Sequence, residues 1–180
     1  MRGHGGLVTL VPAVIAVCVA CGAAPVGAGR VGRTAEADAV MRGKVVRVVD
    51  GDTLDVRSGS RTYRVRLLGL DAAEVAHDGR PAQCGAGAAR VALDRLVSGR
   101  EVVVRGDPVA DRQDRFGRLL GYVEVDGSDV GARLVAAGRA GAWHPRDSVS
   151  PGRYEDYARA AADARAGGVG GWGECGRQGR

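Results

Sequence analysis

Three carboxylates and two guanidinium groups between positions 52 and 118 form a set suited to phosphodiester chemistry. Carboxylate oxygens are the ligands that hard cations such as calcium prefer. An arginine side chain holds a phosphate through two parallel hydrogen bonds. The set therefore predicts metal-assisted cleavage of a phosphodiester. Its members are Asp52, Arg66, Asp71, Glu74 and Arg118.

Taken singly, each of these residues has a simpler structural interpretation. The Asp-Gly-Asp sequence at 50–52 is typical of a hairpin turn, and Arg66 alone would be a solvated residue on a strand. An EF-hand loop that starts at Asp50 is excluded, because its sixth position would be Asp55 rather than glycine. Only the occurrence of all five together favours a catalytic site.

Short strands joined by turns must position these residues. Runs of β-branched and alternating residues predict strands over 44–49, 53–57 and 62–70. The Asp-Gly and Ser-Gly pairs between them are turn signals. Along 62–70, arginines alternate with apolar residues. We therefore expect the charged and apolar side chains to face opposite sides of this strand.

The rest of the chain reads as helices and two further strands. Apolar residues at helical spacing predict helices over 85–97, from 128 or 129 to 137, and over 152–166. Strands are expected over 101–105 and 119–125, and the glycine-rich segment 168–173 is expected to be flexible. This order predicts an α+β, mainly β architecture: a five-stranded OB-fold barrel with three packed α-helices.

The composition fits one globular domain. The 180 residues are 45% apolar and 26% charged, which excludes a chain that is disordered throughout. Aromatic residues make up only 4%, so the core must consist mainly of valine, leucine and alanine. The net charge of +5 is compatible with an anionic partner.

The N-terminal residues carry the pattern of an export signal. An apolar run over 7–20 follows Arg2 and precedes small residues. This run is shorter than the roughly 20 residues that a membrane-spanning helix needs. Alternatively, Cys21 is the lipid-modified residue of a lipoprotein, or the run is a buried N-terminal helix. Candidate cleavage positions follow Ala20, Ala24 and Ala28.

These patterns divide the chain into four parts. We expect a signal peptide at 1–28, a flexible linker at 29–40, a globular domain at 41–176 and a short tail at 177–180. The mature protein is then secreted and extracellular, or it is anchored to a membrane as a lipoprotein through Cys21.

Two cysteines remain outside the leader. Because an exported protein meets an oxidising environment, Cys84 and Cys175 are predicted to form a disulfide that ties the C-terminal end to the region before the first helix. A zinc site that adds His77 and His144 is the alternative, but these spacings resemble no zinc motif.

Three segments resemble the staphylococcal nuclease-like (thermonuclease) family. They are DGDT at 50–53, RLLGLDAAE at 66–74 and DRFGR at 114–118, and the resemblance covers residues 42–175. It implies a calcium site with Asp52, Asp71 and the backbone carbonyl of Ala72 as protein ligands.

The same resemblance implies the remaining roles. Glu74 is expected to position or deprotonate the attacking water, and Arg66 and Arg118 are expected to grip the scissile phosphate. The chain departs from the family at Ala72, where threonine is usual, and at Phe116, where tyrosine is common. The expected substrate-binding residues are Asp114, Arg115, Phe116, Trp143 and His144.

The expected function is that of a secreted, monomeric, calcium-dependent nuclease acting on DNA and RNA. In the family, water attacks phosphorus, the 5′-oxygen leaves and a 3′-phosphate remains. Two alternatives stay open: a non-catalytic nucleic-acid-binding OB-fold domain, and a surface lipoprotein that serves adhesion or protein contact.

Overall fold

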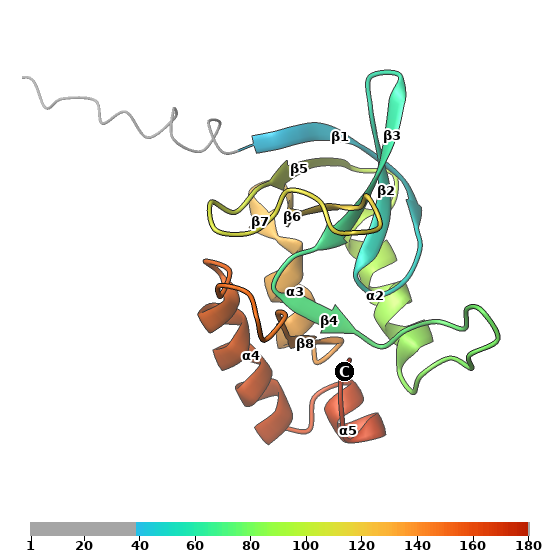
Figure 1. Cartoon of the computed structure of the whole chain (residues 1–180). Helices are drawn as coiled ribbons and strands as arrows, with labels where there is room; N and C mark the ends of the chain where they lie inside the picture. Colours follow the sequence, from blue (N-terminus) through green and yellow to red (C-terminus); the bar gives the residue numbers. More distant parts are fainter. Residues whose placement is uncertain (1–38, 180) are drawn as a thin grey trace, which may run out of the picture. The chain divides into compact units, whose positions relative to one another are not determined.

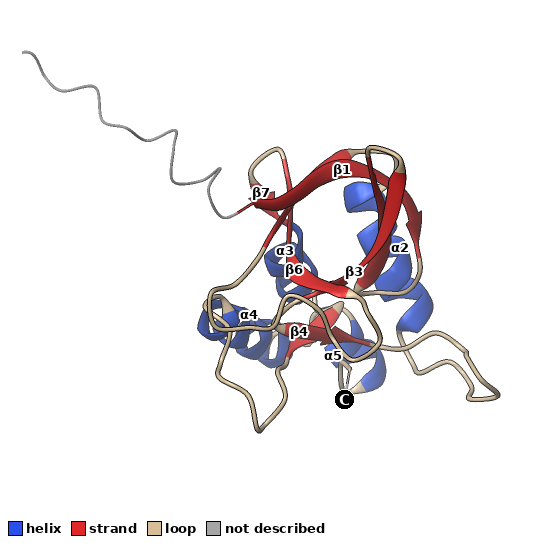
Figure 2. Ribbon diagram, turned by 45° about the horizontal axis from the view of Figure 1, so that its top comes forward, coloured by secondary structure: helices blue, strands red, loops and turns tan. Residues whose placement is uncertain are grey.

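A computed structural model describes residues 39–179, which contain a closed β-barrel (Figure 1). Its strands are β1 (Ala39–Val48), β2 (Thr53–Ser58), β3 (Arg61–Leu67), β5 (Glu101–Arg105) and β6 (Leu119–Val125). They pair antiparallel in the order β3-β2-β1-β5-β6. A parallel pairing of β3 with β6 closes the ring of strands that Figure 2 shows. The predicted five-stranded OB-fold barrel is confirmed.

Two glycines and a bulge let these strands curve and approach closely. A Cβ atom at Gly43 would lie 2.4 Å from the carbonyl oxygen of Arg57, and one at Gly121 would lie 2.7 Å from the β5 backbone. Larger residues at either position would push the strands apart. In β1 the register shifts between Val45 and Arg47, which marks a bulge and increases the local twist.

The predicted strand over 62–70 is in fact two strands separated by a turn. β3 ends at Leu67, and Gly69, with a φ of 81°, leads into β4 (Leu70–Ala72). β4 pairs antiparallel with β8 (Ala140–Ala142) in a small second sheet. Because a φ in this region favours glycine, Gly69 allows the sharp change of direction that returns Asp71 toward β3.

Within residues 39–179, four helices pack below and beside the barrel in Figure 1. They are α2 (Ala86–Val97), α3 (Val130–Ala136), α4 (Tyr154–Ala166) and α5 (Gly171–Cys175). The first three agree with the predicted helices to within two residues at each end. At the start of α3, directly after the short strand β7 (Ser128–Asp129), the Asp129 carboxylate caps the helix by accepting from the Ala132 backbone N at 3.0 Å.

Helix α5 overturns the expectation that 168–173 is flexible. The Gly171 backbone N donates to the Gly138 carbonyl oxygen at 2.9 Å, and Cys175 at the other end is bonded to Cys84. Both anchors come from distant parts of the chain, so no local pattern indicated them.

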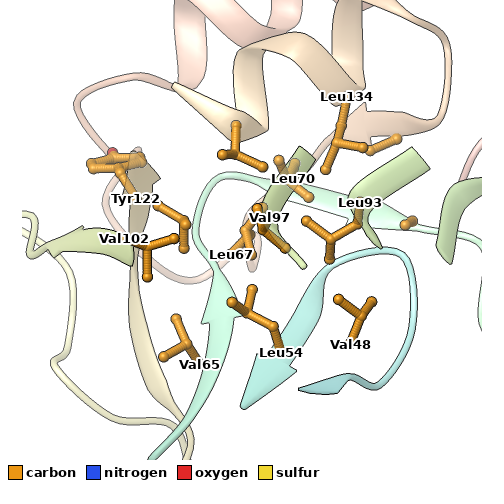
Figure 3. Close-up of a cluster of buried hydrophobic side chains, with 14 of the residues drawn as sticks. Val48, Leu54, Val65, Leu67, Leu70, Leu93, Val97, Val102, Tyr122 and Leu134 are labelled. Carbon is orange, nitrogen blue, oxygen red and sulfur yellow. The ribbon is translucent and has the colours of Figure 1, made fainter. Parts of the chain in front are cut away.

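The core consists mainly of valine, leucine and alanine, as predicted. Leu54, Val65 and Leu67 from the barrel are at most 2% exposed. Leu93 of α2 and Leu134 of α3 belong to the same buried cluster (Figure 3). The barrel and these two helices therefore share one core, which fixes the strands that carry the charged residues.

The predicted disulfide between Cys84 and Cys175 is present, with an S–S distance of 1.96 Å across 91 residues. Closing a loop of that length stabilises the fold by about 4–5 kcal/mol in the chain-entropy model. Because both sulfur atoms are in this bond, the alternative zinc site is excluded.

The described residues begin close to the predicted start of the domain. β1 starts at Ala39, two residues inside the predicted linker, whereas the predicted signal peptide and Cys21 lie outside the described residues. Among residues 39–179, no helix combines the length and apolar character that a membrane crossing requires.

Candidate active site

Arg66 lies at the centre of the site, buried between two carboxylates. Its Nη2 atom is 3.0 Å from Asp52 Oδ2 and 2.8 Å from Asp71 Oδ1. Its Nη1 atom donates to the carbonyl oxygens of Leu67 and Leu70 at 2.8 and 2.9 Å. Arg66 is only 7% exposed, because these four partners replace water around its charge. Arg66 is therefore not the solvated strand residue that it would be if taken alone, because both sides of the strand are covered at this point.

Backbone pairing brings these groups together from separate segments. Arg66 pairs with Thr53 across β2 and β3, so the turn that carries Asp52 lies beside it. The Asp52 carboxylate also accepts from Ala72 N at 2.9 Å and from the Thr53 hydroxyl at 3.0 Å. These bonds join the DGDT and RLLGLDAAE segments directly and hold Asp52 close to Asp71.

Asp50 is a further carboxylate of the site, although its sequence position indicated only a turn. It is 9% exposed, and its Oδ1 atom accepts from the Asp52 backbone N at 3.0 Å. Burial first, and then the negative charges of Asp52 and Glu74, raise its pKa to about 7. Its position two residues before Asp52 could have indicated a role in the site, but a hairpin turn accounts for an aspartate there equally well.

Glu74 is partly buried and lies two residues after the end of β4. Its backbone N donates to Gln83 Oε1 at 3.0 Å, and its carbonyl oxygen accepts from Gln83 N at 2.9 Å. The loop between these two residues is thus closed at its base. The negative charge of Glu74 contributes to the raised pKa of Asp50. The Glu74 carboxylate therefore lies close enough to Asp50 to interact with it electrostatically.

The donors at this site fit a hard cation. Asp52 and Asp71 each place an oxygen within 3.0 Å of the same Arg66 nitrogen, so the two carboxylates converge. Two further acidic side chains nearby leave an excess of negative charge. Among residues 39–179, no group of three or more histidine, cysteine or acidic side chains is arranged to hold a metal. Backbone carbonyl, water and substrate oxygens would therefore supply most of the ligands of a hard cation held here.

A cleft of about 670 Å³ opens beside this cluster. Arg66 and Arg118 both line it, so the two predicted phosphate-binding residues face one space. Asp52, Asp71 and Glu74 are not among its lining residues, nor is Ala72, which makes Arg66 the link between the carboxylates and the cleft. All five predicted substrate-binding residues line it: Asp114, Arg115, Phe116, Trp143 and His144.

Arg118 is oriented by Asp114, four residues before it. The Arg118 Nε atom donates to Asp114 Oδ2 at 2.7 Å, while Asp114 Oδ1 accepts from the backbone N atoms of Phe116 and Arg118 at 2.9 and 3.0 Å. Burial alone would raise the pKa of Asp114, but these hydrogen bonds hold it below the ordinary value. Asp114 is therefore negatively charged, and it positions Arg118 by accepting a hydrogen bond from its Nε atom.

Aromatic side chains stand at the edge of the cleft. Phe116 is 67% exposed, and the Cζ atoms of Arg115 and Arg118 lie 4.7 and 5.5 Å from its ring centroid. An exposed ring between two cations can stack on a base while the cations meet phosphates. Trp143 is held in place by its backbone N, which donates to the Gly69 carbonyl at 3.0 Å.

The C-terminal residues expected to form a tail are instead packed against the site. Gln178 is 5% exposed. A Cβ atom at Gly179 would lie 2.6 Å from Asp71 Oδ2, so only glycine lets the backbone come this close. This contact joins residues more than a hundred positions apart, and the short tail carries no pattern that indicates burial.

The fold and two of the three motifs, RLLGLDAAE and DRFGR, agree with a known family. Residues 64–174, more than half of the chain, match the family described as staphylococcal nuclease homologue. This chain belongs to that family. Nucleases of the family generally depend on a metal ion.

Individual relatives extend this comparison. The chain is similar to a micrococcal nuclease from Shigella flexneri, with 33% identity over 136 residues that cover 71% of this chain and 72% of the relative. It is also similar to an uncharacterized endonuclease from Escherichia coli O157:H7, with 38% identity over 102 residues that cover 56% of this chain. The chain spans 60% of the length of that endonuclease.

Proposed function

We propose that this protein is a calcium-dependent nuclease that hydrolyses phosphodiester bonds in DNA and RNA. The observation that carries the proposal is the position of Arg66, which joins a pair of converging carboxylates to a cleft that Arg118 also lines. Membership of the family and relatives named nuclease and endonuclease support it.

The acidic cluster provides the metal ligands in this proposal. The carboxylates of Asp52 and Asp71 and the carbonyl of Ala72 would hold a calcium ion. The bound ion supplies positive charge that offsets the phosphate and holds it for in-line attack. Calcium suits this role because all the protein donors are oxygens.

The two arginines bind the phosphate from the cleft side. Arg118 is already oriented by Asp114, whereas calcium bound to Asp52 and Asp71 would release the Nη2 atom of Arg66 from these carboxylates toward the phosphate. Each such donor contributes about 3 kcal/mol to stabilising the extra charge of the transition state.

Glu74 accepts the proton of the attacking water. Its backbone is fixed by two hydrogen bonds with Gln83, and its carboxylate lies near the aspartates. Attack on phosphorus then expels the 5′-oxygen and leaves a 3′-phosphate, while Phe116 and Trp143 contact the neighbouring bases. Stacking on such rings contributes about 1–3 kcal/mol per base.

Export of the protein is part of the same proposal. The apolar run at 7–20 has the composition of a leader, and Cys84 and Cys175 form a disulfide, a bond typical of oxidising compartments. Mass spectrometry of the mature N-terminus distinguishes a cleaved, free terminus from an acylated Cys21. An uncleaved leader would contradict export by this route.

A nuclease assay on residues 29–180 tests the proposal. We expect cleavage of single-stranded DNA and RNA with calcium, no cleavage with a chelator, and products that carry 3′-phosphates. Glu74→Gln should bind the same DNA and leave it uncut. If the unchanged protein binds DNA equally with and without calcium but never cuts it, the non-catalytic OB-fold function replaces this one.

A further inference from the structure

The disulfide joins two segments that each reach a carboxylate of the site. One is residues 83–85, which contain Cys84 and which we call the Gln83 arm. The other is residues 176–179, which follow Cys175 at the end of α5 and which we call the C-terminal arm. The two cysteines are 91 residues apart, so this bond is a direct covalent link between segments that are distant in the chain.

The Gln83 arm holds the backbone of Glu74 on both of its polar groups. Gln83 Oε1 accepts from Glu74 N at 3.0 Å, and Gln83 N donates to the Glu74 carbonyl oxygen at 2.9 Å. The Gln83 carbonyl oxygen accepts in turn from the N atom of Ala86, the first residue of α2, at 3.1 Å. Residues 76–82 between them are exposed. The position of Glu74 after β4 therefore depends on where Gln83 is held.

The C-terminal arm packs against Asp71 and its partner strand. Asp71 pairs with Gly141 in the sheet of β4 and β8. A Cβ atom at Gly141 would lie 3.1 Å from the Gln178 carbonyl oxygen. A Cβ atom at Gly179 would lie 2.6 Å from Asp71 Oδ2 and 2.7 Å from the Asp71 carbonyl oxygen. The backbone of this arm therefore limits the space in which the Asp71 carboxylate can lie.

The two arms contact each other at the disulfide. A Cβ atom at Gly85 would lie 3.6 Å from Cys175 Sγ and 3.7 Å from Gln178 Nε2. Only four positions separate Cys175 from Gly179. The last residues of a domain are ordered where other contacts tie them down. Here a covalent bond lies within one helical turn of the residues that pack against Asp71.

We infer that this disulfide is a positioning element of the active site: it holds the Gln83 arm against Glu74 and the C-terminal arm against Asp71. The inference rests on the proposed function, because it concerns the base and a calcium ligand of that reaction. Full activity then belongs to the oxidised protein. Cys84 is exposed, so a dithiol reductant can reach the bond. In the exchange the reductant becomes a disulfide, and its two protons pass to the two cysteine sulfurs.

Two substitutions in the oxidised protein test the arms separately. Gln83→Met removes the acceptor of the Glu74 N–H and should lower kcat about 10²-fold without changing calcium affinity, because a misplaced base slows only the chemical step. Gly179→Ala should weaken calcium binding about 10–100-fold, the usual effect of disturbing a group that orients a metal ligand. Calorimetry without substrate measures this affinity. Gly176→Ala is the matched control: the two glycines have φ values of 71° and 64°, but a Cβ atom at Gly176 meets nothing within 4 Å.

Reduction of the unchanged protein tests both arms together. We expect a lower kcat and a higher Kd for calcium, with a far-UV circular dichroism spectrum that shows the barrel still folded. The double variant Cys84→Ser, Cys175→Ser should show both changes already, and reductant should add nothing to them.

Two results would overturn the inference. One is the same kcat and calcium Kd in the oxidised and reduced protein. The other is a Gly179→Ala variant that binds calcium as tightly as Gly176→Ala does, and this comparison also decides the matter if the reduced protein unfolds. An oxidised, unchanged protein that cuts no nucleic acid with calcium contradicts the proposed function instead, whereas the calorimetric comparison still tests the C-terminal arm.

Discussion

Replacing Arg66 with methionine removes the cation that holds two buried carboxylates together. Asp52 and Asp71 are 2% and 1% exposed, and each has an oxygen within 3.0 Å of the Arg66 Nη2 atom. Methionine has a similar length but no charge, so the two carboxylates lose the guanidinium group that lies between them in the metal-free protein. Removing one partner of a buried ion pair costs about 3–5 kcal/mol. For a domain of this size, that loss lowers Tm by about 10–15 °C.

Arg64→Met is the matched control on the same strand. Arg64 also binds an aspartate through two hydrogen bonds, to Asp55 at 2.9 and 3.2 Å, but its side chain is 47% exposed. An exposed pair contributes less than about 1 kcal/mol. The two variants therefore separate the effect of burial from the loss of a charge.

Calcium should restore part of the stability that Arg66→Met loses. A divalent ion supplies charge between Asp52 and Asp71, and without Arg66 it no longer competes with a bound guanidinium. Ligand at a hundred times its Kd adds about 2.7 kcal/mol to the stability of the folded state. Thermal unfolding followed by circular dichroism, with a chelator and across a calcium series, measures both effects. Equal destabilisation by the Arg66 and Arg64 variants, or a calcium shift no larger than in the unchanged protein, would refute the reasoning.

Three further changes test other parts of the structure. Glu74→Gln should lower kcat about 10²–10⁴-fold with little change in KM on labelled single-stranded DNA; full activity would exclude Glu74 as the base. Replacing Cys84 and Cys175 with serine should cost about 4 kcal/mol in urea unfolding, and reduction of the unchanged protein should match it; an unaltered midpoint would contradict the loop-closure argument. Asp107 accepts hydrogen bonds from the Tyr122 hydroxyl and Gly152 N at 2.6 and 2.7 Å, which hold its pKa below the ordinary 3.8 although burial alone would raise it. The contribution of the Asp107 carboxylate to stability is complete at pH values above its ordinary pKa, and it disappears as the pH falls through the lowered pKa of the folded protein. Asp107→Asn should therefore be less stable than the unchanged protein near pH 7 and equally stable near pH 2. A difference in stability between the two proteins that stays constant from pH 7 to pH 2 would show that the charge of the Asp107 carboxylate does not stabilise the fold.

Local sequence signals were sufficient for many elements of the fold. β5 and β6 have the predicted bounds, because β5 contains a run of valines and β6 ends at the Asp-Gly turn pair at 126–127. The start of α3 was predictable for a similar reason: Asp129 caps the helix through a residue three positions away. In these elements the decisive interactions lie within a few residues of each other.

Other elements depend on partners that are distant in the chain. β4 has three residues and exists through its pairing with β8, some seventy positions later. α5 is held by Gly138 and by the disulfide to Cys84. Gln178 is buried in a segment whose composition predicted a tail. Short segments of this kind have too few local contacts to specify their own structure.

The sequence by itself determined which chemistry was available. Asp52, Asp71 and Glu74 carry oxygen donors, Arg66 and Arg118 carry guanidinium groups, and two of the three motifs lie within residues 64–174, which match the family. Only the tertiary structure decided that Arg66 is withdrawn from water and joins the carboxylates to the cleft. The reason is physical: a side chain carries its own charge and donors wherever it lies, but its exposure and neighbours follow from backbone pairings between distant segments.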